Sequence, residues 1–150
     1  MARAFVFPGQ GSQAVGMGRA LAEALPTARH VFEEVDEALK QNLSQMMFDG
    51  PEDQLTLTEN AQPALMAMSV AVMRVLERDG GVEWGKHARF VAGHSLGEYS
   101  ALCATGALRL DDTARLLKRR GQAMQQAVPV GEGAMAALLG LDFEAAGGGA

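Results

Sequence analysis

The residues best suited to covalent chemistry lie in the pentapeptide GHSLG at residues 93–97. A G-x-S-x-G sequence between a strand and a helix is typical of a sharp turn that exposes a serine hydroxyl. Glycines tolerate the strained backbone of such a turn and leave no side chain to crowd it. The run at residues 88–92 is strand-like and residues 98–104 can be helical, so the required context is present. The pattern predicts Ser95 as a nucleophile, with a glycine-bounded turn and a helix-capping serine as the alternative.

A second glycine-rich loop, PGQGS at residues 8–12, follows the short apolar run at residues 4–7. In parallel α/β sheets, the loops that follow the strands line the ligand-binding crevice. A serine that attacks a carbonyl also needs N–H donors for the oxygen that becomes negative, and a helix start supplies them. We expect the backbone N–H groups of Leu96 and Gln10 to form this oxyanion hole. An ordinary turn before a helix is the alternative for the loop around Gln10.

The chain has three histidines, and none is a convincing general base for Ser95. His94 is adjacent to the serine, but neighbouring side chains on a sharp turn point apart. His30 falls on an expected helix and His87 near a loop, so both are predicted to lie at the surface.

Strand-like runs and segments of helical periodicity alternate along the chain. Parallel strands need a crossover, usually a helix, so the alternation predicts an α/β fold with a parallel sheet. Thr58 or Asn60 is the candidate cap of the longest helix, and Pro63 is expected in its first turn. The expected helices cover residues 17–25, 31–39, 60–76, 98–104 and 110–124, ending before Gly131 and Gly133, with a turn at 49–52 and a further strand at 134–139.

Composition indicates a single globular domain and excludes several classes of protein. The chain has 150 residues, 48% of them hydrophobic, and a formal charge of -5, which argues against binding to nucleic acid. No apolar run approaches the roughly 18 residues of a membrane helix, and Pro8 interrupts the first one too early for a signal peptide. Cys103 is the single cysteine, which excludes an intrachain disulfide and a cysteine-based zinc site. We expect a soluble cytoplasmic protein with a buried Cys103 and no metal.

Several longer motifs occur together and in a fixed order. They resemble the malonyl-CoA:acyl carrier protein transacylases and the related acyltransferase domains of fatty-acid and polyketide synthases, over nearly the whole chain up to about Leu141. The motifs are FPGQGSQ at residues 7–13, TENAQPAL at 58–65, GHSLGEYSAL at 93–102, RRGQAMQ at 119–125, AVP at 127–129 and GAMAALLG at 133–140.

The resemblance implies a large α/β-hydrolase-like subdomain into which a ferredoxin-like small subdomain is inserted. Residues 1–130 would then be the amino-terminal part of the large subdomain, and residues 131–150 the first strand of the small one with a glycine-rich end. The resemblance also implies that Ser95 is the nucleophile, that Gln10 and Leu96 form the oxyanion hole, and that Arg120 binds the malonyl carboxylate. Without it, Arg120 is only part of a basic run late in a helix, where cations favour the negative end of the dipole. Met124 is a further candidate for the acyl pocket, with core packing as the alternative.

The activity implied by the resemblance is transfer of malonyl from malonyl-CoA to the phosphopantetheine thiol of acyl carrier protein, through a malonyl-serine, in fatty-acid biosynthesis. No cofactor is implied, because the CoA thioester is a substrate. The family's catalytic histidine would lie beyond residue 150, so we expect this chain alone to be inactive, with a second chain as one possible source of the histidine. The first motif begins almost at Met1, which favours a free-standing enzyme.

Three alternatives remain open. A polyketide acyltransferase with a preference for methylmalonyl is the nearest. A serine hydrolase shares the turn but passes the acyl group to water, and Arg120 and the FPGQGSQ motif argue against it. A non-catalytic fragment that binds carrier protein or is purely structural is the third.

Overall fold

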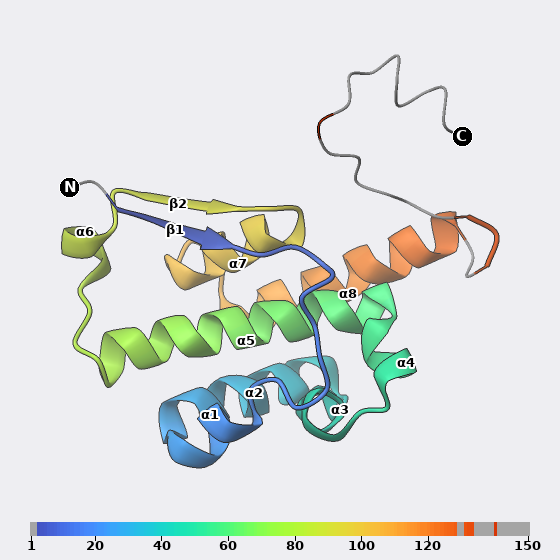
Figure 1. Ribbon diagram of the computed structural model, residues 1–150, viewed down its shortest axis with the longest axis horizontal. Helices are drawn as coiled ribbons and strands as arrows, with labels where there is room; N and C mark the ends of the chain where they lie inside the picture. Colours follow the sequence, from blue (N-terminus) through green and yellow to red (C-terminus); the bar gives the residue numbers. More distant parts are fainter. Residues whose placement is uncertain (1–2, 129–130, 134–139, 141–150) are drawn as a thin grey trace.

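The computed structural model describes residues 3–128, 131–133 and 140. These residues form a helix-rich α/β arrangement (Figure 1), which confirms the predicted class of fold. The elements are β1 (Ala4–Phe7), α1 (Arg19–Ala24), α2 (Pro26–Leu39), α3 (Leu43–Asp49), α4 (Glu52–Thr56), α5 (Thr58–Arg78), α6 (Trp84–His87), β2 (Phe90–Gly93), α7 (Leu96–Ala104) and α8 (Leu110–Ala127).

The strands β1 and β2 pair in parallel, as the alternation of strands and helices predicted. Ala4 lies opposite Phe90 at one end of the pair, and Phe7 lies opposite Gly93 at the other. Because the strands are parallel, the loop after β1 and the turn after β2 leave the sheet at the same edge. The two glycine-rich segments found in the sequence therefore meet at one place.

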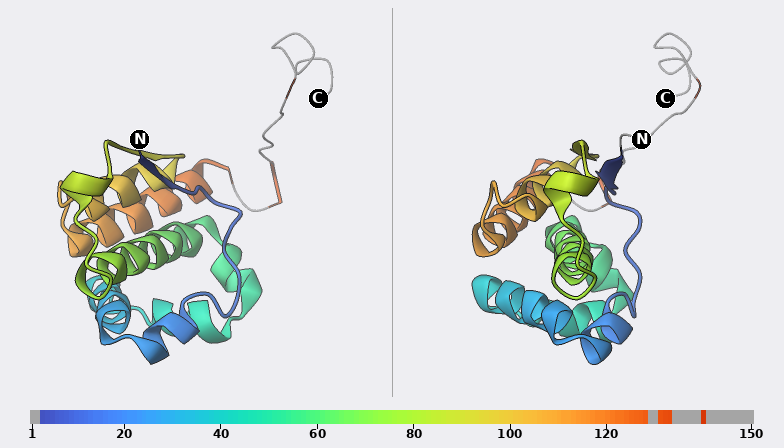
Figure 2. Two further views of the ribbon diagram at one scale, coloured as in Figure 1. Left: turned by 60° about the vertical axis from the view of Figure 1, so that its left-hand side comes forward. Right: turned by 90° about the vertical axis from the view of Figure 1, so that its left-hand side faces the viewer.

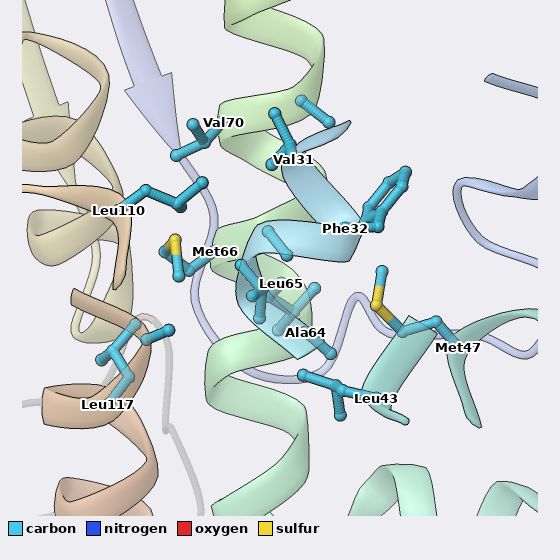
Figure 3. Close-up of a cluster of buried hydrophobic side chains, with 14 of the residues drawn as sticks. Val31, Phe32, Leu43, Met47, Ala64, Leu65, Met66, Val70, Leu110 and Leu117 are labelled. Atoms are coloured by element: carbon cyan, nitrogen blue, oxygen red, sulfur yellow. The ribbon is translucent and has the colours of Figure 1, made fainter. Parts of the chain in front are cut away.

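The longest helix, α5, is the centre of the core. Both views in Figure 2 place it between α2 on one side and α7 and α8 on the other, and it contacts all three. Apolar residues at helical spacing make this packing possible, because they form an apolar stripe on each helix. Figure 3 shows Leu65, Met66 and Val70 of α5 among buried side chains of α2, α3 and α8. Full burial of each such side chain stabilises the fold by about 1.5–3 kcal/mol.

The ends of α5 differ in part from the prediction. It ends at Arg78, two residues after the predicted end, and it begins at Thr58 with Leu57 at its cap and no side-chain capping bond. Thr58 and Asn60 were wrong as caps because their side chains bind elsewhere, including the Asn60 amide N–H that donates to the Gln54 carbonyl at 2.9 Å. Pro63 lies inside the helix, beyond its first turn.

Other boundaries also moved. The predicted turn at residues 49–52 joins two short helices that the sequence did not indicate, α3 and α4, and α6 is a third. The last helix ends at Ala127, three or more residues before the predicted glycines. The strand expected at residues 134–139 lies outside the described residues, and the division near residue 130 stays a prediction. Within the part of the chain that is described, no helix is both long and apolar enough to cross a membrane.

Candidate active site

Ser95 occupies a strained bend between β2 and α7. Its backbone dihedrals are φ 55° and ψ -114°, a region that residues other than glycine seldom adopt. The bend is closed by the Gly97 N–H, which donates to the His94 carbonyl at 2.9 Å, and by the Glu98 N–H, which donates to the Ser95 carbonyl at 3.2 Å. Ser95 is exposed, as predicted. The order of β2, the bend at Ser95 and α7 confirms the predicted strand, sharp turn and helix.

The two glycines of the motif are required by close backbone packing. A Cβ on Gly93 would overlap the backbone of Gly97, and a Cβ on Gly97 would lie 2.8 Å from the Pro8 carbonyl oxygen and closer still to that of Phe7. The first turn of α7 therefore rests directly on the end of β1. This contact sets where the serine stands relative to the loop that carries Gln10.

The histidines lie as the sequence predicted. The backbone N–H of His94 donates to the Phe7 carbonyl at 3.1 Å, and its ring packs against Gly9. His30 and His87 are exposed on α2 and α6. Among the hydrogen bonds of the described residues, none joins a histidine to Ser95.

Arg120 reaches the serine from α8. Its Nη2 donates to the Ser95 Oγ at 3.0 Å, and its Nη1 donates to the Gln62 Oε1 at 2.6 Å. The guanidinium carbon also lies 5.7 Å from the centre of the Tyr99 ring, within the range of a cation–π contact. Two residues selected from the sequence are thus brought together, with Gln62 and Tyr99 as additional neighbours.

A close approach of α8 to α5 places Arg120 at this position. A Cβ on Gly121 would lie 2.5 Å from the Glu59 Cα, so only glycine lets the two backbones come so near. On the other side of the contact, the Lys118 ammonium lies 3.1 Å from the Glu59 carboxylate. The hydrogen bond from Lys118 is the main reason why the pKa of Glu59 is lowered, against the opposing effect of burial.

Gln10 joins the site through side chains of α5. The Thr58 hydroxyl donates to the Gln10 Oε1 at 2.8 Å, and the Gln62 Nε2 donates to the Thr58 Oγ1 at 2.9 Å. Hydrogen bonds therefore connect Gln10 to Ser95 through Thr58, Gln62 and Arg120. The sequence did not select Thr58 or Gln62 for the site, because nothing local distinguishes them from the other polar residues at the start of α5.

The remaining candidates also have definite positions. Leu96 is the first residue of α7 and is buried, whereas Gln10 is exposed, and their role as oxyanion donors stays a prediction. Met124 lies beside the site, where its sulfur accepts from the Gln62 Nε2 at 3.3 Å. Cys103 is buried as predicted, and burial is the main cause of its raised pKa, which makes a reactive thiolate unfavourable.

The described residues thus combine an α/β fold, a serine at a glycine-flanked bend and an adjacent arginine, features on which the resemblance to acyltransferases rests. In agreement, residues 4–145 match the family model described as "Acyl transferase domain". The chain belongs to this family, which confirms the resemblance found in its motifs.

Several relatives with curated names are malonyl CoA-acyl carrier protein transacylases. The chain is 53% identical over 142 residues to that of Bacillus subtilis strain 168, a match that covers 95% of this chain and 43% of the relative. It is 48% identical over 139 residues to that of Escherichia coli K12, covering 93% of this chain and 44% of the relative. The chain thus spans less than half the length of these relatives.

Solved structures agree with this relationship. The acyl-carrier-protein-S-malonyltransferase of Bartonella henselae superposes with a TM-score of 0.90 at 64% identity, over 96% of this chain and 46% of that one. A malonyl-transacylase solved in complex with a type II PKS acyl-carrier protein superposes with a TM-score of 0.79 at 44% identity, over 86% of this chain and 40% of that one.

Proposed function

We propose that this chain is the nucleophile-bearing part of a malonyl-CoA:acyl carrier protein transacylase of fatty-acid biosynthesis. The observation that carries the proposal is the 3.0 Å contact between the Ser95 hydroxyl, held at a strained bend, and the Arg120 guanidinium. The names of the relatives support the choice of malonyl-CoA and acyl carrier protein as substrates. The described residues would belong to an α/β-hydrolase-like subdomain.

In the first half-reaction, the Ser95 Oγ attacks the thioester carbonyl carbon of malonyl-CoA, and a base takes the hydroxyl proton. Negative charge develops on the carbonyl oxygen, where the N–H groups of Leu96 and Gln10 would stabilise it. The carbon–sulfur bond then breaks. CoA leaves as a thiol with the proton, and the malonyl group remains on Ser95 as an ester.

In the second half-reaction, the phosphopantetheine thiol of acyl carrier protein attacks the ester carbonyl. The thiol proton passes through the base to the Ser95 oxygen as the carbon–oxygen bond breaks. The products are malonyl-acyl carrier protein and the free serine. The sequence of steps is a ping-pong transfer without any change of oxidation state, so no redox cofactor takes part.

Arg120 would select acyl groups that carry a free carboxylate. A guanidinium is a planar fork that can donate two parallel charge-assisted hydrogen bonds to a carboxylate, whereas a lysine offers a point charge. Because Nη1 is already bound to the Gln62 Oε1, the Nη2 donor that now contacts Ser95 is suited to turn towards the substrate. Malonyl is favoured over acetyl by this contact.

The general base would come from outside this chain, either from the part of the relatives' length that the chain does not span or from a second chain. Removing the histidine of a serine triad costs on the order of a millionfold in rate. We therefore infer that these residues alone are inactive. One face of the strand pair is apolar and exposed, since Val6 is 72% and Phe90 59% exposed. This exposure supports the inference that further structure covers that face.

Intact-mass measurement after incubation with malonyl-CoA tests the proposal on both the chain and the complete gene product. A malonyl adduct should form on the complete product, map to Ser95, and be lost in Ser95→Ala but kept in the control Ser12→Ala. Adding pantetheine should move the malonyl group to the thiol. Release of free malonate instead would favour a hydrolase, and absence of any adduct on the complete product would contradict the proposal.

A further inference from the structure

A relay of side-chain hydrogen bonds joins the two ends of the candidate site. It runs from Arg120 to Gln62, from Gln62 to Thr58 and from Thr58 to Gln10, with donor–acceptor distances of 2.6, 2.9 and 2.8 Å. One end holds the cation beside Ser95, and the other holds the loop after β1. Gln62 and Thr58 both come from the first two turns of α5.

The direction of each hydrogen bond in the relay is determined by Arg120. A guanidinium can only donate, so the oxygen of the Gln62 amide must face it, and the amide nitrogen must face Thr58. The Thr58 oxygen accepts from that nitrogen, which leaves the hydroxyl proton free to donate to Gln10. The acceptor in reach is the Gln10 Oε1. A reversed amide at Gln62 would place two donors against each other.

Burial makes this arrangement rigid at its centre. The Gln62 side chain is 0% exposed, so its amide cannot exchange partners with water. Burying an amide without partners is costly, and both of its ends are satisfied here. Gln10 is exposed, and its hydrogen bond from Thr58 links the loop after β1 to the core helix α5.

We propose that Thr58 is a positioning residue that ties the Gln10 loop to the same buried amide that orients Arg120. The proposal rests on the proposed function, because it assigns the two arms of the relay to two parts of the transfer reaction. The Gln62 arm orients the guanidinium that meets the acyl carboxylate. The Thr58 arm holds the loop whose N–H group stabilises the oxyanion.

The two arms have different kinetic consequences. Thr58→Val keeps the shape of the side chain but removes the hydroxyl that tethers Gln10, so kcat should fall about 10-fold for malonyl and acetyl transfer alike. Gln62→Leu removes the acceptor of Arg120, so KM for malonyl-CoA should rise about 10-fold with less effect on acetyl transfer. Thr58→Ser restores the hydroxyl and should recover most of the activity.

The experiment measures malonyl and acetyl transfer by the complete gene product and its variants, with Thr56→Val as the matched control. Thr56 is an exposed threonine of the neighbouring helix α4, and its replacement should change neither constant. Circular dichroism confirms that each variant is folded. The kcat of each variant is therefore expressed per folded molecule. A loss in Thr58→Val that is fully explained by a smaller folded fraction, or that Thr58→Ser does not recover, would overturn the positioning role.

Hydrogen exchange of the Gln62 side-chain amide, followed by NMR, tests the relay without using the transfer activity. We expect exchange to be at least about 10-fold faster in Thr58→Val than in Thr58→Ser, because the buried acceptor is lost. Equal exchange rates would overturn the relay. If the wild-type protein transfers no acyl group, the proposed function fails, whereas the exchange rates still decide the hydrogen bonding at Thr58.

Discussion

The Nη2 atom of Arg120 lies 3.0 Å from the Oγ atom of Ser95, although 25 positions separate the two residues in the chain. The serine oxygen accepts this bond, so its own proton remains available to a base. The face of the Tyr99 ring lies near the same guanidinium, at 5.7 Å from its carbon. A cation is thus held beside the Ser95 hydroxyl by groups from α5, α7 and α8.

Replacing Arg120 should separate malonyl from acetyl transfer. Arg120→Ala removes the guanidinium that we propose to bind the acyl carboxylate, and we expect kcat/KM for malonyl transfer to fall about 100-fold. Acetyl carries no carboxylate, so its transfer should change by less than about 3-fold. Steady-state assays of the complete gene product measure both. Arg119→Ala is the matched control, because Arg119 is an exposed neighbour on the same helix. Equal losses for both acyl groups would contradict the assignment of Arg120.

Ser95 should be a position where stability and function conflict. Its φ of 55° is unfavourable for any side chain, and such strain costs about 1–3 kcal/mol. Ser95→Gly relieves the strain, whereas Ser95→Ala retains it, and both remove the hydroxyl that we propose as the nucleophile. We expect the glycine variant to be more stable than the alanine variant by about 1 kcal/mol after the entropy of the unfolded glycine is included. Urea unfolding compares the two variants, and an alanine variant of equal or greater stability would argue against the strain.

Gly97 should not tolerate even a methyl group. A Cβ at this position would lie 2.8 Å from the Pro8 carbonyl oxygen and nearer to the Phe7 carbonyl. Gly97→Ala must push α7 away from β1, and we expect it to lower the free energy of unfolding by about 3 kcal/mol. Gly85→Ala is the control, because a Cβ there would meet no atom within 4 Å. Similar urea midpoints for the two variants would show that α7 can move at little cost.

The contact between α5 and α8 should weaken in acid. The pKa of Glu59 is lowered mainly by its hydrogen bond from Lys118, so the ionised carboxylate stabilises the folded state. This contribution is complete above the unfolded-state pKa of about 4.3 and is lost as the pH falls through the lower folded-state pKa. Glu59→Gln should therefore lose less stability between about pH 6 and about pH 3 than the wild type does.

A double-mutant cycle with Lys118→Met provides the control for Glu59. The Lys118 ammonium is the nearest cation, at 3.1 Å from the carboxylate. In the Lys118→Met background, Glu59→Gln should alter the pH dependence of unfolding much less. An unchanged effect of Glu59→Gln in that background would mean that Lys118 does not cause the lowered pKa.

The geometry of the serine turn was predictable because it is encoded locally. The glycines at 93 and 97 and the apolar runs on either side specify a strand, a bend and a helix within a dozen residues, and the structure has that order. The burial of Cys103 and the exposure of His30 were also predictable, since both residues lie on expected helices, and the exposure of His87 was predicted from its place near a loop. Arg120 was selected through the resemblance of the motifs, because nothing local distinguishes it from Lys118 and Arg119.

The cap of α5 and the role of the Gln62 amide as a partner of Arg120 could not be predicted from local pattern. Thr58 and Asn60 have the side chains of typical caps, yet tertiary partners at Gln10, Gln54 and Gln62 use those side chains instead. Gln62 looks like a polar interruption of an apolar helix until α8 supplies Arg120 as its donor. Short helices such as α3 and α4 carry too few residues for a clear period, because one or two turns give only one or two repeats.

The sequence by itself determined the class of fold, the family and the serine at its bend, because these depend on residue types at short, fixed spacings. The tertiary structure alone decided that the guanidinium of Arg120 contacts that serine and that Thr58 and Gln62 join it to Gln10. These contacts depend on how closely α5 and α8 approach at Gly121 and on how α7 rests on β1. Distances between helices arise from packing of the whole core, and no local stretch of the chain contains them.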